Sequence, residues 1–245
     1  MYHQDTDDRY GPDGRIRDFF ADGHDVTTSL FVTAAMGLAH GLDTWGQVSF
    51  HDLAFDDAGG HRQKTGVGDV RLWLRASPEF LGLSGPIPIA VRAGVKLPGS
   101  TFPVDAEVIP LNDGQRDWEV MLELGSSLWP APVYLQGWVG YRWREQNDEV
   151  LWDPGDEVFY YAAAGGELGR LTWKLASQGL FGRPPVVEGV EVANGRRKLV
   201  EVVPKAGIRV GSITLEAGMR LPVDGRNFPH GPIYLVGTFV RWSIF

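Results

Sequence analysis

A two-residue alternation of apolar and polar side chains runs along most of this chain, and it constrains the fold more than any other feature. Apolar residues occupy every even position from Leu30 to Leu38, whereas Ser29, Thr33 and Gly37 lie at odd positions. Successive side chains of a β-strand point to opposite faces, so this pattern predicts a strand with one apolar face. Similar runs recur ten more times, at 44–55, 69–76, 87–97, 117–128, 133–144, 157–168, 171–181, 198–210, 213–221 and 233–245.

The lengths of these strands and of their connections favour a membrane barrel. Most strands are 9–13 residues long, whereas roughly 5–6 residues are usual in globular sheets and a tilted bilayer-crossing strand needs roughly 9–11. Short connections, such as 81–85, follow the first, third, fifth, seventh and ninth runs, and longer polar ones, such as 56–66 and 98–116, follow the others. An up-and-down transmembrane barrel has this asymmetry, with tight periplasmic turns and long external loops.

A soluble all-β domain is the alternative fold, because its strands also carry one apolar face. Strand length and loop asymmetry count against it, and so do aromatic residues near the strand ends, where a membrane barrel has its girdles. The girdle candidates are Trp118, Trp129, Tyr141, Trp143, Trp173, Trp242 and Phe245. We therefore expect an outer-membrane barrel in contact with membrane lipid.

The number of strands predicts one more at the N-terminus. Eleven runs can be counted, whereas single-chain bacterial barrels close with an even number. Residues 1–7 look like the upper end of a first strand, and the acidic, turn-rich remainder of 1–25 looks like an external loop. We therefore predict an all-β, up-and-down antiparallel transmembrane β-barrel of about 12 strands, eleven complete and the first truncated, with 26–245 as the barrel. The rest of that strand and a signal peptide are expected upstream of Met1.

The final run, 233–245, is aromatic-rich and ends on Phe245, as a closing barrel strand would. Counting back from Phe245 by twos selects Phe239 and Leu235 for the lipid face, but it also selects Arg241. The opposite parity collects Val236, Val240, Trp242 and Ile244. An outward arginine at the bilayer edge is tolerable, so we expect the parity of Phe245 to face lipid.

Several classes of chemistry are disfavoured. The chain has no cysteine and therefore no thiolate metal site, and its net charge of −8 argues against a nucleic-acid partner. The six histidines are scattered without metal-ligand spacing, so no metal or cofactor is expected. His51 and Asp52 near an external strand end could suggest a catalytic pair, but Ser49, a serine on the same face as His51, lies two residues away along the strand, about 7 Å, which is too far for direct contact. No Gly-x-Ser-x-Gly motif is present, and we expect no enzyme activity.

Charged residues in mid-strand predict a polar lumen, because they lie opposite the apolar face. The lumen-facing charged residues are predicted to be Arg71, Arg75, Arg92, Lys96, Glu119, Glu123, Arg142, Arg144, Glu167, Lys174, Glu216 and Arg220, with Glu201, Lys205 and Arg209 nearby. Sequential strands are neighbours in an up-and-down barrel, so these charges form adjacent rows. Two interpretations stay open: a salt-bridge network that fills the lumen, or a partly basic wall that selects anionic solutes.

Short motifs resemble those of a known family. The segment 66–72 reads Gly-Val-Gly-Asp-Val-Arg-Leu at a strand entry, 40–43 reads His-Gly-Leu-Asp, and 96–100 reads Lys-Leu-Pro-Gly-Ser. Together with 109–115 and 140–144, they resemble outer-membrane proteins of the phenol meta-pathway degradation type. His40 stands where that family has tyrosine, and the order within 96–100 is altered. The resemblance implies a barrel of about twelve strands that transports hydrophobic or aromatic compounds, and it carries no site residues.

The sequence thus predicts a bacterial outer-membrane channel or transporter for small solutes, which the family resemblance suggests are hydrophobic or aromatic. The alternative is a structural outer-membrane barrel whose charge-filled lumen conducts nothing. The amino-acid sequence does not identify the solute.

Overall fold

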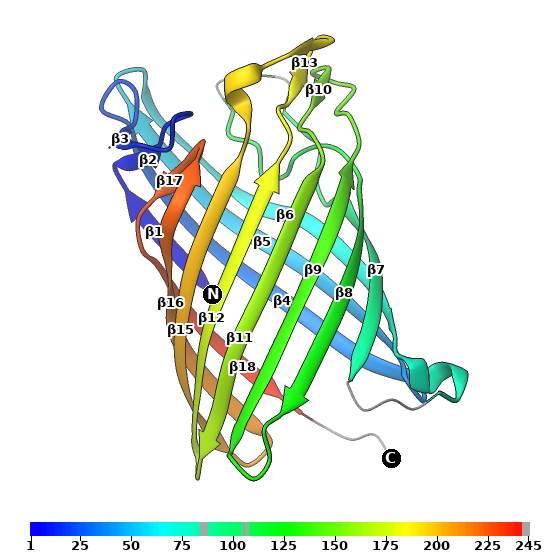
Figure 1. Cartoon of the computed structure of the whole chain (residues 1–245). Coiled ribbons are helices and arrows are strands. Elements are labelled where there is room, and N and C mark those ends of the chain that lie inside the picture. The colour runs from blue at the N-terminus through cyan, green and yellow to red at the C-terminus, as the bar shows by residue number, and fades with distance from the viewer. Residues whose placement is uncertain (84–87, 104, 106–107, 242–245) are drawn as a thin grey trace.

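The chain forms a closed antiparallel barrel in a computed structural model that describes residues 1–245 except 84–87, 104, 106–107 and 242–245. Twelve strands of the described residues close it in the order β1-β18-β16-β15-β12-β11-β9-β8-β7-β6-β5-β4 (Figure 1). These strands are β1 (Tyr2–Thr6), β4 (His24–Ala39), β5 (Leu42–Asp57), β6 (Gly60–Ala76), β7 (Ile89–Pro98), β8 (Asp117–Ser127), β9 (Val133–Arg144), β11 (Glu157–Leu168), β12 (Leu171–Gly182), β15 (Lys198–Val210), β16 (Ile213–Arg226) and β18 (Ile233–Val240). The predicted all-β, up-and-down barrel of about twelve strands is confirmed.

The two ends of the barrel differ, as the connection lengths predict. At one end, called here the turn end, pairs of strands meet in tight turns such as Gly211-Ser212, where Gly211 has a φ of 61°. A side chain at that backbone angle would be strained, so glycine suits the turn. The long connections 99–116, 145–156 and 183–197 gather at the opposite, loop end, at the top of Figure 1.

Short strands and 3-10 helices lie outside the twelve barrel strands. Two three-stranded sheets lie at the loop end: β10 (Trp152–Asp153), β13 (Val186–Val187) and β14 (Val190–Glu191) form one, and β2 (Asp8–Tyr10), β3 (Ile16–Asp18) and β17 (Phe228–His230) form the other. The 3-10 helices are η1 (Pro78–Leu81) and η2 (Ala193–Gly195). Within the described residues, no helix is both long and apolar enough to span a membrane.

Strands β5 and β6 extend farther than the sequence predicts. The expected polar loop at 56–66 is wrong, because β6 begins at Gly60 and pairs with β5 up to Asp57. Asp52 accepts hydrogen bonds from Gln63 and Thr65 across this extension. At the loop end both faces of this hairpin meet water. The alternation of apolar and polar residues therefore disappears there while strand pairing continues.

The connection predicted as a brief turn at 81–85 is also longer. It contains η1 and continues to β7, which begins at Ile89. The expected start of that strand at residue 87 lies outside the described residues.

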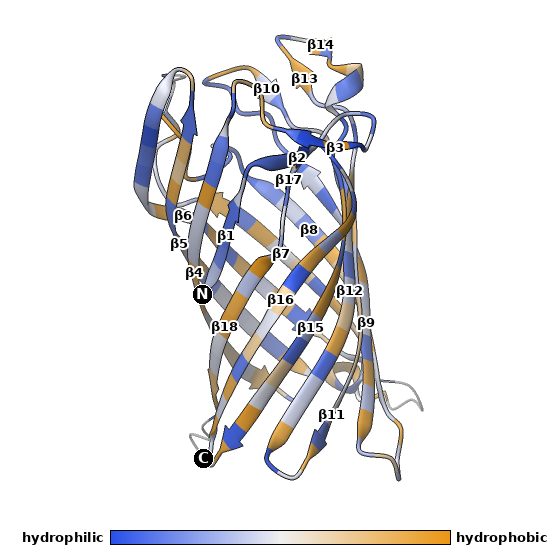
Figure 2. Ribbon diagram, turned by 90° about the vertical axis from the view of Figure 1, so that its left-hand side faces the viewer, coloured by the Kyte–Doolittle hydropathy of each residue, from blue (hydrophilic) through white to orange (hydrophobic). Residues whose placement is uncertain are grey.

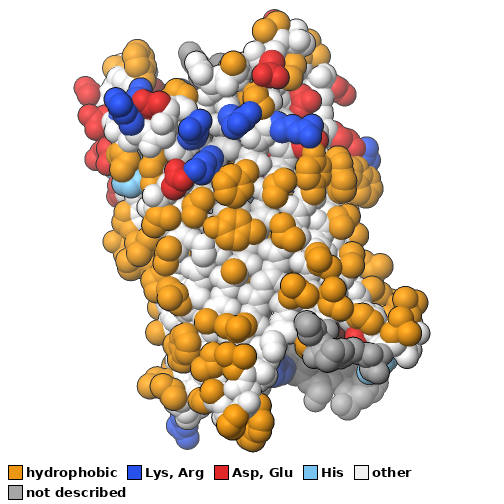
Figure 3. All heavy atoms as spheres, in the orientation of Figure 1, with side chains coloured by type: hydrophobic (Ala, Val, Ile, Leu, Met, Phe, Trp, Pro, Cys, Tyr) orange, Lys and Arg blue, Asp and Glu red, His pale blue; other side chains and the backbone are white. Residues whose placement is uncertain are grey.

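The outer surface of the barrel is an apolar belt. The even-numbered side chains of β4 from Leu30 to Leu38 point outward, and large apolar residues of the other strands do the same. Figure 3 shows this belt around the middle and turn end of the face in view, with charged side chains concentrated at the loop end, and Figure 2 shows hydrophobic and hydrophilic bands alternating along the strands. Monomeric soluble proteins rarely expose so extensive an apolar surface.

Aromatic residues contribute to the belt. Trp118 and Trp143 are register partners on the outer face, and Trp129 at the turn end is 87% exposed. Tyr141 packs against Trp143 with ring centroids 4.8 Å apart, and Trp173 is also exposed. The girdle candidates Trp242 and Phe245 lie outside the described residues.

The facing predicted for the final strand is wrong. Ile233 is 5% exposed and pairs with the lumen-facing Arg220, whereas Tyr234 is 53% exposed on the outer face. The parity that includes Phe239 and Arg241 is therefore the lumen side. Pairing with β16 sets this register, because the charges of β16 must face the polar interior.

The N-terminal segment contains more than one strand end and a loop. Strand β1 pairs with β18 through three residues and with β4 through five, so it closes the barrel. Strand β4 begins at His24, two residues before the predicted start of the barrel at position 26.

Candidate functional site in the barrel lumen

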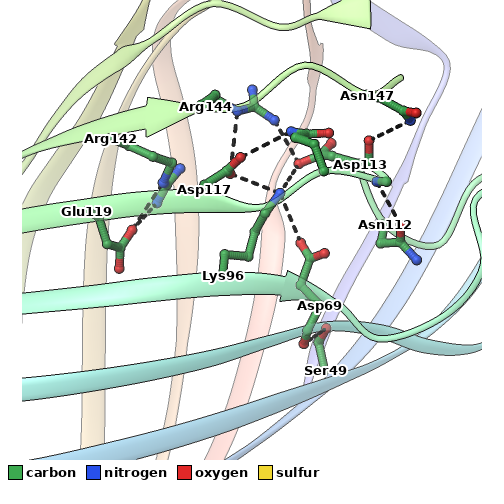
Figure 4. A network of polar contacts seen from close by, with 12 residues as sticks. Ser49, Asp69, Lys96, Asn112, Asp113, Asp117, Glu119, Arg142, Arg144 and Asn147 are labelled. Carbon is green, nitrogen blue, oxygen red and sulfur yellow. Dashed lines mark hydrogen bonds and ion pairs between the residues drawn. The ribbon is translucent and has the colours of Figure 1, made fainter. Parts of the chain in front are cut away.

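A dense network of ion pairs covers one side of the lumen, and Lys96 lies near its centre. Lys96 is 1% exposed, and its Nζ lies 2.7 Å from Asp113, 2.9 Å from Asp117 and 3.6 Å from Asp69 (Figure 4). A buried ammonium is costly unless it is paired. Three carboxylates from β6, β8 and the connection before β8 supply that pairing.

Two arginines of β9 continue the network. Arg142 contacts Glu119 at 3.0 Å and Glu157 at 2.8 Å. Arg144 contacts Asp113 at 2.8 Å and Glu157 at 3.2 Å. Each guanidinium therefore bridges carboxylates from different elements, which its planar fork of donors permits.

The network is balanced in charge, and we call it the charged wall. Its members are the cations Lys96, Arg142, Arg144 and Arg197 and the carboxylates Asp69, Asp113, Asp117, Glu119 and Glu157. Arg71, the register partner of Lys96, lies beside them and forms no ion pair among the described residues. When Arg71 is counted with them, five cations and five carboxylates leave no formal net charge. The charged wall therefore presents no excess formal charge to the lumen.

A second group of charges lies nearer the turn end. Arg75 contacts Glu123 at 2.7 Å and Asp43 at 2.9 Å, and Arg92 also pairs with Glu123. The Arg92 guanidinium lies 4.0 Å from the centroid of the Trp45 ring. These contacts again neutralise two arginines with two carboxylates.

The described residues of the connection 99–116, called here the inserted loop, include Leu111 to Asp113, which lie at the loop end of the lumen. Leu111 is buried, the Asn112 amide donates to the Ser100 carbonyl at 2.8 Å, and the Asn147 amide donates to the Asp113 carbonyl at 3.1 Å. Burial alone would raise the pKa of Asp113, but the charges of Lys96 and Arg144 more than offset this and hold that pKa well below its usual range. Asp113 therefore stays ionised and attaches the loop to the charged wall.

The remaining charges predicted for the lumen belong to neither the charged wall nor the group around Arg75 and Arg92. Glu167 accepts a hydrogen bond from Arg209 at 2.7 Å near the turn end, and Glu216 lies 4.0 Å from Lys205. Lys174 is the register partner of Lys205. Among the described residues, neither Lys174 nor Arg220 forms an ion pair.

Sequence reasoning missed several members of the charged wall. Asp117 and Glu157 each begin a strand with the same parity as a predicted lumen charge, so the alternation could have identified them. Asp113 belongs to a connection and Arg197 directly precedes β15, and no periodic signal marks their position.

The opposite side of the lumen, formed by β1, β4, β5, β15, β16 and β18, contains cavities. A cavity of about 300 Å³ includes Phe31, Lys205 and Phe239 in its lining. A second one of about 300 Å³ shares Tyr2, Phe31 and Arg220 with the first. A third, of about 250 Å³ under the inserted loop, shares Thr27 and Leu53 with the second. We call this side the open wall.

A hydrogen-bonded chain lies beside the second cavity. His51 Nδ1 lies 2.7 Å from Ser29 Oγ and His51 Nε2 lies 3.0 Å from Ser49 Oγ, so the expected 7 Å separation of His51 and Ser49 is wrong. A bulge between Val48 and Phe50 interrupts the regular pairing with β6 there. Ser49 donates its proton to the Asp69 carbonyl and must accept from Nε2. The neutral imidazole therefore accepts from Ser29 at Nδ1.

Comparison with known proteins identifies the fold. The crystal structure of an outer membrane channel from Pseudomonas putida F1 is similar, with a TM-score of 0.75 over 97% of this chain and 92% of that chain. The two sequences are 14% identical, so the likeness establishes a shared barrel architecture. No protein-family model and no curated protein matches the chain, and the resemblance to the phenol meta-pathway group is not confirmed.

Proposed function

We propose that this protein is an outer-membrane channel for small solutes that have an apolar part. The observation that carries the proposal is the unequal lumen. Paired charges fill one wall, whereas three neighbouring cavities follow the other from Phe239 to the underside of the inserted loop. The similar outer membrane channel supports the membrane location, as does the apolar belt.

The lining of the open wall supports a solute with an apolar part. Tyr2, Phe31 and Leu53 contribute rings and methyl groups, while Gln47 and Arg220 contribute polar ends. Binding sites for small organic molecules commonly combine an apolar lining with a few polar groups. A barrel of twelve strands lies between the filled eight-stranded case and the aqueous sixteen-stranded one, which fits a narrow passage.

Single-cysteine variants in planar bilayers test the route. The chain contains no cysteine, so each variant has one thiol. We expect a charged thiol reagent to reduce the current through Gln47→Cys, because Gln47 lines the first cavity. The matched control is Val48→Cys. The Val48 side chain follows Gln47 in the chain but points to the outer face, so the reagent should leave the current through this variant unaffected.

Two results would contradict the proposal. Absence of both ion current and solute uptake in liposomes would favour the structural barrel with a closed lumen. Equal inhibition of the two cysteine variants would show that solutes do not follow the open wall.

A further inference from the structure

The second cavity of the open wall contains a single formal charge. Tyr2, Ser29, Phe31, His51, Leu111 and Arg220 are among the residues that line it, and its lining includes no carboxylate. Its volume of about 300 Å³ is at the lower end of the range for sites that bind small organic molecules, which begins at roughly 300 Å³. The cavity could therefore hold a molecule of about one ring.

Arg220 has no acidic partner among the described residues. Its guanidinium lies 5.8 Å from the centroid of the Tyr2 ring, and no ion pair or hydrogen bond accompanies that contact. By contrast, Lys96, Arg142 and Arg144 of the charged wall each contact two or more carboxylates. An arginine left unpaired beside a cavity, in a lumen where most charges are paired, is available to an anionic ligand.

The neighbouring side chains define the rest of the ligand. Tyr2 and Phe31 present two aromatic rings and Leu111 an apolar side chain from the inserted loop. A planar apolar group gains most from such walls, because rings pack on rings in offset or edge-to-face geometry. Arginine recognises a carboxylate with two parallel hydrogen bonds.

We propose that this cavity is a binding site for single-ring aromatic monocarboxylates, with the carboxylate on Arg220 and the ring between Tyr2 and Phe31. This inference rests on the proposed function, because it names the solute class for the same passage. The Ser29 and His51 side chains supply a polar patch in the same cavity.

Equilibrium dialysis of the detergent-solubilised protein against labelled benzoate tests the site. We expect saturable binding that Arg220→Gln weakens by roughly 10-fold or more, since a charged hydrogen-bond partner is lost. Arg220→Lys keeps the charge without the fork of donors and should give intermediate binding. Arg209→Gln is the matched control, because Arg209 pairs with Glu167 near the turn end, and it should bind like the unaltered chain.

The ligand itself provides further controls. Benzyl alcohol keeps the ring without the charge and acetate keeps the charge without the ring, so both should bind at least about 10-fold more weakly. Equal binding of benzoate by Arg220→Gln and the unaltered chain would overturn the proposal, and so would equal binding of acetate and benzoate. Heat-modifiable migration in gels verifies that each variant forms a barrel.

Failure of this inference is distinguishable from failure of the channel function. Ion current without benzoate binding would refute the aromatic carboxylate site and leave the channel intact. Benzoate binding without ion current or solute uptake would support the site and refute the channel.

Discussion

At the scale of single residues, the lumen contains charges that are paired by their neighbours and a charge that is not. Lys96 is nearly inaccessible and contacts three carboxylates, whereas Arg220 contacts none among the described residues. In the sequence both residues are mid-strand cations on the polar face, and the alternation does not distinguish them. Their difference arises from what the neighbouring strands and the inserted loop place beside them.

Replacing Lys96 by methionine should destabilise the barrel severely. Asp117 and Asp69 would keep their burial but lose a cation, and breaking a buried pair costs about 3–5 kcal/mol. Urea unfolding from lipid vesicles measures the change. Arg209→Gln removes an exposed pair with Glu167 and should cost at most about 1 kcal/mol. Similar costs for the two variants would contradict this interpretation of the charged wall.

His24 should make the loop end sensitive to pH. Its Nδ1 lies 2.6 Å from Asp7, and this hydrogen bond, with the charges of Asp5, Asp7 and Asp56, raises the pKa of His24. A raised folded-state pKa means that its stabilising contribution is complete below about pH 6.5, the ordinary value. The contribution is lost as pH rises through the raised value.

The measurement is the thermal unfolding midpoint of the unaltered chain and of His24→Gln at several pH values. We expect the substitution to lower the midpoint at pH 5.5 and to have little effect at pH 8.5. A difference that grows with rising pH would show that the sign is wrong.

At the scale of elements, the inserted loop connects the two walls of the lumen. It carries Leu111 into the open wall and Asp113 into the charged wall, so one connection contacts both sides. Its attachment is electrostatic on one side and apolar on the other. A change at Asp113 should therefore loosen the loop without altering any barrel strand.

We expect Asp113→Asn to increase the single-channel current and its fluctuations. The neutral amide would weaken contacts of 2.7 Å with Lys96 and 2.8 Å with Arg144, and a charged hydrogen bond is worth roughly 1.5–3 kcal/mol. Planar bilayer recordings measure the effect. Asp148→Asn, in an exposed part of the next long connection, is the control. Unchanged current in Asp113→Asn would show that the loop does not restrict the passage.

At the scale of the whole molecule, the apolar belt is the surface of the barrel that would face the membrane in the proposed channel. Val139 lies at the middle of β9 and is exposed on the outer face between Leu122 and Tyr160. The surface around it consists of similar side chains, which is the arrangement that hydrocarbon requires.

Val139→Arg should lower the free energy of unfolding from lipid vesicles by roughly 2–4 kcal/mol, the cost of an arginine at the bilayer midplane. Val187→Arg places the same change in β13 at the loop end and should have little effect. Equal effects would mean that β9 does not cross the middle of a bilayer.

The positions of most strands and their apolar outer face could be predicted from the sequence because both follow from the alternation itself. The rows of charges on β6 to β9 were also accessible, since sequential strands are neighbours. The partners of Lys96 could not be predicted fully, because Asp113 lies in a connection whose path depends on tertiary contacts. The facing of the last strand was mistaken because both parities of 233–245 are apolar, so only pairing with β16 could decide it.

The meeting of the first and last strands has a consequence for the order of folding. The amino group of Met1 lies 2.6 Å from the carbonyl of Val236, across 235 positions of sequence. Hairpins between sequential strands form through local contacts, whereas contacts of such long range are the slowest to form. Tyr2 belongs to this seam and also lines the cavity of Arg220. The proposed solute site would therefore be completed only when the cylinder closes, and benzoate binding would report the final step of assembly.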